Sequence, residues 1–279
     1  MVGYNRVEEK IKTKIEKAVV EMRREVVQLT YDAGTTGAHI GGSLSLIEIM
    51  ATLYLGVLRY NLDDMNIEDR DRVIFSKGHG ALALYTAMYH AGIIEKNDLM
   101  QYKKDDSCLS AHPAMNERIG IEFSSGSLGQ GLSLAVGVSL ALKMKKNQTS
   151  QIYVILGDGE CNEGSVWEAA QSAAHFNCNN IVAIVDFNKL QYDGRTKDIM
   201  RDEPFADKWK SFGWEVININ GHDIDEIYNA LNSVYNKPLV ILAHTIKGKG
   251  ISFMEDNTLW HNHALSAQQY ELAMSELGE

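Results

Sequence analysis

Residues 152–159, Ile-Tyr-Val-Ile-Leu-Gly-Asp-Gly, decide the fold because they join an apolar strand to a glycine-rich turn. A run of five apolar residues with β-branched side chains is typical of a strand that is covered on both faces. In the turn, Gly157 and Gly159 let a phosphate approach the backbone, and the carboxylate of Asp158 offers the hard oxygen that Mg²⁺ prefers. An ordinary strand-to-helix turn is the alternative interpretation, and three residues alone do not decide between the two.

The rest of the chain alternates short β-branched runs with longer helical patterns. Strands are predicted at residues 72–75, 152–156, 181–187, 214–219 and 239–243. Helices are predicted at residues 15–29, 80–91, 131–145, 165–176 and 224–235, and Ser45 with Glu48 forms a capping-box pattern that predicts a further helix start. This alternation indicates an α/β fold, a doubly wound and mostly parallel sheet with helices on both faces. No repeat or linker divides the chain, so we expect one domain over residues 1–279.

Composition excludes several classes of protein. The formal net charge of −10 argues against binding to nucleic acid or to an anionic membrane, because both need a positive surface. The three cysteines, Cys108, Cys161 and Cys178, fall in no metal-binding spacing and favour free thiols in a reducing compartment. Residues 1–17 lack the apolar core of a signal peptide, and the longest apolar run, residues 132–142, is too short to span a membrane. We therefore expect a soluble, cytoplasmic protein.

Polar segments follow four of the five predicted strands, and this is where ligands bind in doubly wound sheets. They are residues 76–80 (Ser-Lys-Gly-His-Gly), 157–160 (Gly-Asp-Gly-Glu), 188–190 (Asn-Lys-Leu) and 244–248 (His-Thr-Ile-Lys-Gly). Asp158 and Asn188 end strands that are separated by a single helix, so both side chains are expected to face the same ion. Mg²⁺ takes about six oxygens and rarely all of them from protein. The pair therefore predicts a metal-bound diphosphate.

These motifs resemble those of transketolases and occur in the same order. The segment from Gly157 to Asn188 is similar to the thiamine-diphosphate fingerprint, which begins with GDG and closes with Asn. The other matching motifs are GAHIGGS at 37–43, SKGHG at 76–80, AHP at 111–113, GSLGQG at 126–131, EG at 163–164 and WH at 260–261. The resemblance spans nearly the whole chain and implies a thiamine-diphosphate-binding fold, with thiamine diphosphate and Mg²⁺ as cofactors.

Carried over motif by motif, the resemblance implies which residues hold the cofactor. They are Asp158, Asn188 and the backbone carbonyl of Leu190 for the metal, His79 and Gly159 for the diphosphate, Gly126 and Leu128 for the aminopyrimidine, and Lys247 in a Lys-Gly loop that closes over the cofactor.

The resemblance also implies catalytic residues. His112 would lie by the amino group of the cofactor and the substrate hydroxyls, while His39 and His261 would line the substrate channel as proton-transfer and hydroxyl-binding groups. Glu163 would help to couple two active sites across a dimer, and an acid favoured by the helix dipole is the alternative interpretation of this residue.

The remaining polar residues have weaker signals. The histidines expected to be structural are His90, His175, His222 and His263, whereas the role of His244 stays open because it ends a strand without a clear motif. Cys161 is expected to be a small packed residue, and the Tyr and Trp side chains are expected to lie in the core.

In transketolases the glutamate that activates thiamine diphosphate lies in a second, pyrimidine-binding domain, and this chain ends about where the first domain would end. We expect the diphosphate-binding subunit of a split transketolase, with two copies of each chain, which transfers a two-carbon ketol unit from a ketose phosphate to an aldose phosphate. Met1 and the polar tail, residues 264–279, favour this over a fragment. The alternatives are the alpha subunit of a 2-oxo acid dehydrogenase, a split enzyme for a sulfo- or branched sugar, and a non-catalytic cofactor-binding module.

Overall fold

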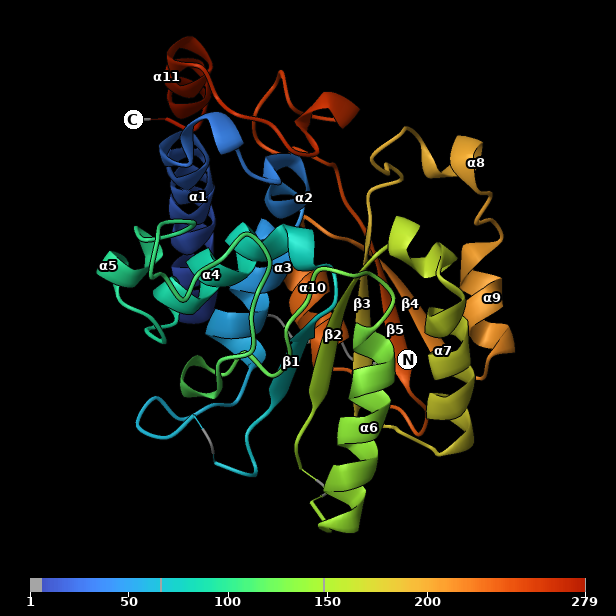
Figure 1. Cartoon of the computed structure of the whole chain (residues 1–279). Helices are drawn as coiled ribbons and strands as arrows, with labels where there is room; N and C mark the ends of the chain where they lie inside the picture. Colours follow the sequence, from blue (N-terminus) through green and yellow to red (C-terminus); the bar gives the residue numbers. More distant parts are fainter. Residues whose placement is uncertain (1–6, 66, 148, 279) are drawn as a thin grey trace.

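The computed structural model describes residues 7–65, 67–147 and 149–278. At its centre is a five-stranded sheet with the order β1-β2-β3-β5-β4, in which every neighbouring pair is parallel (Figure 1). The strands are β1 (Arg72–Phe75), β2 (Ile152–Gly157), β3 (Ile181–Phe187), β4 (Glu215–Asn220) and β5 (Leu239–His244). Parallel neighbours require crossover connections, which the intervening helices supply.

The two faces of the sheet bury two separate apolar layers. Val73, Ile155 and Ile241 belong to the layer that contains residues of α1, α2, α3, α4, α10 and α11, whereas Ile74 and Val154 belong to the layer under α6, α7 and α9 (Figure 1). The helices are α1 (Glu9–Asp32), α2 (Ile40–Leu44), α3 (Ile47–Thr52), α4 (Ala81–His90), α5 (Lys96–Leu99), α6 (Gly131–Met144), α7 (Gly164–His175), α8 (Thr196–Ile199), α9 (Phe205–Ser211), α10 (Ile224–Leu231) and α11 (Ala267–Glu276). Side chains alternate between the two faces of the sheet along a strand. A strand that is apolar at every position therefore contributes side chains to both apolar layers. The predicted doubly wound α/β fold is confirmed.

The predicted strands coincide with the observed ones to within about one residue at each end, a normal margin for such boundaries. The helices agree less well at their ends. Helix α1 is longer than the predicted residues 15–29, and α10 ends at Leu231 rather than at residue 235. The additional N-terminal residues of α1, 9–14, are polar except for the half-buried Ile11, so the apolar periodicity gave little sign of them.

The capping box predicted from Ser45 and Glu48 is wrong. Helix α3 begins after Leu46, and no side chain caps it. The hydroxyl of Ser45 instead donates to the carboxylate of Asp186 at 2.6 Å, and Glu48 forms a buried ion pair with Arg23 of α1. Helix α2 lies in the glycine-rich stretch directly before Ser45. Contacts with residues distant in the sequence therefore determine the orientation of both the Ser45 and the Glu48 side chain.

Within the described ranges, no helix is both long enough and apolar enough to cross a membrane. Residues 1–6 of the N-terminal segment that lacks a signal-peptide pattern, and residue 279 of the polar tail, lie outside the described residues.

Candidate active site

A cavity of about 260 Å³ lies at the carboxyl edge of the sheet, beyond the ends of β1, β2 and β3. Of the residues predicted from the sequence, the cavity wall contains Asp158, Asn188, Leu190, His79, Gly159, Leu128, Lys247, His261 and Glu163. The parallel strands bring these segments together because their carboxyl ends share one edge. His39, His112 and Gly126 lie outside this wall, although His39 packs against the rings of His79 and His261, and His112 packs against His39.

Asp158 is almost fully buried, with 2% of its surface exposed. Its carboxylate accepts hydrogen bonds from the backbone N–H of Gly159 at 2.8 Å and of Lys189 at 2.5 Å, so it joins the ends of β2 and β3. Burial and then the nearby charge of Asp186 raise the pKa of Asp158 to about 7. Asp158 forms no ion pair with any described residue, so a bound cation would relieve the cost of keeping this buried carboxylate charged.

Asn188 and Leu190 complete a set of oxygen donors beside Asp158. The side-chain nitrogen of Asn188 donates to Asp186 at 3.2 Å, which fixes the orientation of the amide, and its oxygen accepts from the N–H of Leu190 at 3.0 Å. The ammonium of Lys247 lies 3.5 Å from the carbonyl oxygen of Leu190. A carboxylate, an amide oxygen and a carbonyl are hard ligands, and the donor set therefore fits Mg²⁺.

Gly159 lies against Gln191, which sequence reasoning did not single out. A Cβ added to Gly159 would meet Cγ of Gln191 at 2.7 Å, closer than side chains approach, whereas a Cβ on Gly157 would meet nothing closer than 3.7 Å. The nitrogen of the Gln191 amide is buried without a hydrogen-bond partner among the described residues. Glycine at position 159 therefore lets Gln191 pack directly on the turn.

Four histidines from four separate segments gather beside the cavity. The ring centroid of His39 lies 5.8 Å from that of His79, 5.3 Å from that of His112 and 5.5 Å from that of His261. Burial is the main cause that lowers the pKa of His39 to about 4 and that of His261 to about 3. Imidazoles that are neutral at pH 7 can donate one hydrogen bond and accept another, which suits the hydroxyl groups of a sugar.

Lys247 and Tyr192 flank His261. The ammonium of Lys247 lies 2.9 Å from Nδ1 of His261, and burial together with the charge of Lys77 lowers the pKa of Lys247 to about 8. The ring of Tyr192 stands edge-on to His261, with centroids 5.1 Å apart, and 67% of its surface is exposed. The expectation that the Tyr side chains lie in the core is therefore wrong for Tyr192, and also for Tyr31 of α1, which is 36% exposed. The position of Tyr192 shortly after Asn188 was the available signal.

A buried ion pair between Lys77 and Asp186 supports the site, and the sequence did not reveal it. Both side chains are at most 2% exposed, and Asp186 also accepts hydrogen bonds from Ser45 and Thr245. Burial alone would raise the pKa of Asp186, but the charge of Lys77 holds it below its ordinary value. Lys77 lies in the SKGHG motif and Asp186 is the next-to-last residue of β3, so the pair fastens the ends of β1 and β3 together.

The residues left open or expected to be structural have partners away from the cavity. His244 is exposed and hydrogen-bonds Asn218 at 3.0 Å. His222 bonds Glu48, His90 bonds Glu25, His175 packs against Phe176, and His263 packs against Trp260. Cys161 is buried, and burial raises its pKa well above the ordinary value of a thiol, as suits a packed and unreactive residue.

Comparison with known proteins agrees with this geometry. The family described as transketolase, thiamine diphosphate binding domain, matches residues 15–279. The crystal structure of transketolase from Campylobacter jejuni superposes with a TM-score of 0.85 at 28% identity, over 97% of this chain and 43% of that one. Human transketolase is 32% identical over 99% of this chain but 44% of that protein.

Other relatives match along nearly their full length. One of the subunits of the apulose-4-phosphate transketolase of Actinobacillus succinogenes is 42% identical over 94% of this chain and 95% of that protein. The 6-deoxy-6-sulfo-D-fructose transketolase subunit SqwG of a Clostridium species is 41% identical over 86% of this chain and 88% of that protein. The family match over residues 15–279 and these relatives establish that the chain belongs to the transketolase family, as its thiamine-diphosphate-binding part.

Proposed function

We propose that this chain is the diphosphate-binding subunit of a split transketolase, which transfers a two-carbon ketol unit from a ketose to an aldose with thiamine diphosphate and Mg²⁺. The observation that carries the proposal is that two chemically different groups of side chains meet at one cavity. The first group is the buried carboxylate of Asp158 with the oxygens of Asn188 and Leu190, which suit a metal-bound diphosphate. The second group is the ring of His261 in the cavity wall and the ring of His39, which packs against it from outside the wall; lowered pKa values keep both rings neutral, which suits the hydroxyls of a sugar.

In this proposal, the chain's own residues bind and orient. Asp158, Asn188 and the carbonyl of Leu190 hold Mg²⁺, while His79 and Gly159 contact the diphosphate. Thiamine diphosphate, when bound, supplies the carbanion chemistry, so the protein contributes position and electrostatics. Hydrogen bonds already fix Asp158 and Asn188 at the ends of β2 and β3, which supports this assignment because preorganised groups need little rearrangement when a ligand enters.

The remaining predicted residues act on the heterocycle and the substrate. Leu128, which lines the cavity together with Glu163, faces the aminopyrimidine. Gly126 lies next to His112, because a Cβ added to Gly126 would stand 3.8 Å from the imidazole ring. His112, together with His39 and His261, orients the substrate hydroxyls and moves protons to and from them. Burial and the charge of Lys103 lower the pKa of His112, which keeps this ring neutral as well. Lys247 closes the cavity over the diphosphate, and Glu163 links this site to a second one.

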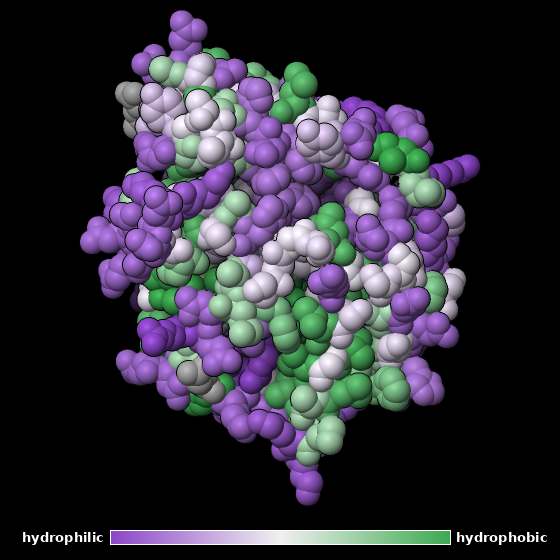
Figure 2. Space-filling model, viewed as in Figure 1, coloured by the Kyte–Doolittle hydropathy of each residue, from purple (hydrophilic) through white to green (hydrophobic). Residues whose placement is uncertain are grey.

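The glutamate that activates the cofactor is proposed to come from a partner subunit with a pyrimidine-binding domain, in an assembly with two copies of each chain. The outer face of α6 supports an interface: hydrophobic side chains gather over this helix (Figure 2), and Leu134, Val138 and Leu140 are only partly buried. An added Cβ at Gly137 on this face would meet nothing within 4 Å. Helix α6 begins directly after the loop of Leu128, so another chain seated on it would lie beside the cavity.

The sugar pair is a further part of the proposal. The two relatives of matching length are named for apulose 4-phosphate and for 6-deoxy-6-sulfo-D-fructose, so an unusual sugar with an anionic group is a specific alternative to the ordinary pentose phosphate substrates. The unusual sugars and the ordinary pentose phosphates share the ketol group, which the histidines would bind. We propose that the protein acts as one domain in the cytoplasm, where its free thiols Cys108, Cys161 and Cys178 stay reduced.

The proposal is tested by reconstituting the full chain with its partner and measuring ketol transfer to an aldose phosphate. Donors are xylulose 5-phosphate, apulose 4-phosphate and 6-deoxy-6-sulfofructose, each with and without Mg²⁺ and thiamine diphosphate. We expect transfer that depends on both cofactors and is lost in Asp158→Ala, while Asp225→Ala, which removes only the ion pair with Lys12, keeps it. Transfer from none of the donors would reject the proposal. An Asp158→Ala chain that assembles and functions normally would favour a scaffold.

A further inference from the structure

Glu160 is a buried carboxylate that binds three separate segments, and none of the roles assigned above involves it. It is 2% exposed at the wall of the cavity. Its side chain accepts hydrogen bonds from the N–H of Gly157 at 2.9 Å, the N–H of Gly129 at 2.8 Å and the hydroxyl of Ser76. The carboxylate therefore joins the turn after β2, the loop before α6 and the end of β1.

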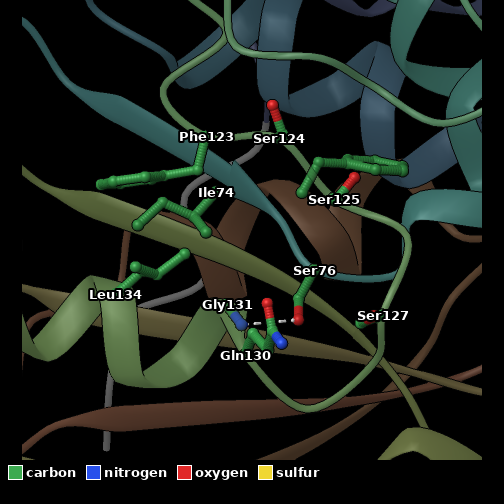
Figure 3. A pocket seen from close by; sticks show the side chains of 10 residues that line it. Ile74, Ser76, Phe123, Ser124, Ser125, Ser127, Gln130, Gly131 and Leu134 are labelled. Atoms are coloured by element: carbon green, nitrogen blue, oxygen red, sulfur yellow. Dashed lines mark hydrogen bonds between the residues drawn. The ribbon is translucent and has the colours of Figure 1, made fainter.

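Ser76 extends this connection to the start of α6. The hydroxyl oxygen of Ser76 accepts a hydrogen bond from the N–H of Gly131 at 3.0 Å, which Figure 3 draws as a dashed line. A Cβ at Gly131 would meet the Cβ of Ser76 at 2.3 Å, so this contact is possible only with glycine at position 131. Glu160 and Ser76 together bind two backbone amides of the GSLGQG loop.

The same loop is held from its other side by the start of α7. The hydroxyl of Ser165 donates to the carbonyl of Gly129 at 2.8 Å, and a Cβ at Gly129 would lie 2.7 Å from that of Glu163. Gly129 has a positive φ of 79°, a conformation that glycine adopts without strain. The loop carrying Leu128 thus rests tightly on residues 160–165, with Glu160 at the centre of the contact.

We propose that Glu160 is a positioning residue that sets the distance between the two ends of the cofactor site. Through Gly157 it holds the turn of Asp158 and Gly159, which takes the diphosphate, and through Gly129 it holds the loop of Leu128, which takes the heterocycle. No other side chain among the described residues is hydrogen-bonded to the backbone of both segments. This inference rests on the proposed function, because it requires a ligand that spans both ends of the cavity.

Asp71 provides a matched control for a role that is merely structural. It is 3% exposed and accepts hydrogen bonds from two backbone N–H groups, those of Arg59 and Gln151, each at 2.9 Å, as well as from the guanidinium of Arg59. It stands just before β1, at the end of the sheet opposite the cavity. Replacing either carboxylate by its amide removes an acceptor from buried N–H groups, but only Glu160 touches the cofactor site.

The experiment compares Glu160→Gln, Asp71→Asn and wild type, each as the full chain with its partner. Binding of thiamine diphosphate and, separately, of inorganic diphosphate is measured by calorimetry at saturating Mg²⁺, and thermal unfolding is recorded without cofactor. We expect Glu160→Gln to bind thiamine diphosphate about 10 to 100 times more weakly, the range typical when residues that orient the side chains of a metal site are changed. Its affinity for inorganic diphosphate should fall far less. Asp71→Asn should lower the unfolding temperature without changing either affinity.

Two results would overturn the inference: a Glu160→Gln chain that binds thiamine diphosphate as wild type does, or one that loses both ligands equally, since Glu160 would then act on the turn alone. If Glu160→Gln does not fold, Ser76→Ala decides, because it removes one donor and leaves Glu160 bonded to both amides. Ser76→Ala should weaken the binding of thiamine diphosphate more than that of inorganic diphosphate, and by less than Glu160→Gln does. Unchanged binding would again reject the inference. Wild type that binds no thiamine diphosphate would instead reject the proposed function.

Discussion

At the scale of single residues, the two glycines of the turn 157–159 have different surroundings. Gly159 is crowded by Gln191, whereas Gly157 has room for a Cβ. The sequence motif presents the two glycines as equivalent, since it shows only their spacing. Their difference arises because Gln191 reaches the turn from the segment after β3, thirty-two residues further along the chain than Gly159.

Gly159→Ala is expected to lower the affinity for thiamine diphosphate about tenfold, since overpacking a tight site costs about 1–3 kcal/mol. Gly157→Ala should bind nearly as wild type does. Calorimetric titration of both variants with Mg²⁺ and thiamine diphosphate measures the difference. Adding Gln191→Ala to Gly159→Ala should restore part of the affinity relative to Gln191→Ala alone, and a double variant with no such recovery would show that the contact with Gln191 is not the cause.

The clustered histidines should titrate well below their ordinary range. Burial lowers the pKa of His39 to about 4 and of His261 to about 3, so NMR titration of labelled imidazoles should find both rings neutral from pH 5.5 to 8. Between the lowered and the ordinary pKa the unfolded chain binds more protons, so the free energy of unfolding must fall as the pH drops from about 6.5 towards 4. His39→Gln and His261→Gln assign the signals, and a midpoint at or above 6.5 for either would contradict the expectation.

At the scale of elements, the packing of α1 on α3 contains a buried ion pair. Arg23 of α1 and Glu48 of α3 are 8% and 6% exposed, and Nδ1 of His222 hydrogen-bonds the same carboxylate at 3.1 Å. Burial would raise the pKa of Glu48, but the hydrogen bond with His222 and the charge of Arg23 hold it below the ordinary 4.5. Nε2 of His222 accepts from the N–H of Ile246, so the pair also anchors the segment that leads to Lys247.

Glu48→Gln should destabilise the chain by about 3 kcal/mol at pH 7, because removing one partner leaves a buried charge unpaired. A carboxylate whose folded pKa is lowered adds stability above its ordinary pKa and loses it as the pH falls through the folded value. The difference between variant and wild type should therefore shrink below about pH 4.5. Urea unfolding at pH 7 and pH 4 measures it. Glu68→Gln, which breaks the exposed pair with Lys145, is the control and should change little.

The elements that the sequence predicted well are the strands, because most are short and mainly apolar runs, while β4 combines β-branched residues with Asn218 and Asn220. The segments that form the cavity could also be predicted, since parallel strands place the residues that follow their carboxyl ends at one edge of the sheet. The capping box failed because a local pattern says nothing about distant partners such as Asp186 and Arg23. Glu160 was missed for the same reason: its hydrogen bonds go mainly to Gly129 and Ser76, in segments far from it in the sequence.

At the scale of the whole molecule, the partly exposed apolar face of α6 is expected to hold the assembly together. Val138→Glu places a charge on this face and should prevent association with the other subunits, which native mass spectrometry or light scattering would detect as a loss of mass. Val20→Glu, at a valine of α1 that is 43% exposed, is the matched control and should leave the mass unchanged. Normal assembly of Val138→Glu would exclude the α6 face as an interface.

The sequence by itself determined the α/β fold, the family and the segments that form the cavity, because apolar periodicity and motifs at strand ends are local properties of a chain. Only the tertiary structure decided which side chains support them. The Lys77–Asp186 pair, the exposed ring of Tyr192 beside His261, the crowding of Gly159 by Gln191 and the bonds of Glu160 with Gly129 and Ser76 all join segments distant in sequence. Burial and hydrogen bonding between such segments depend on how the strands are ordered in the sheet, and spacing along the chain carries no record of that order.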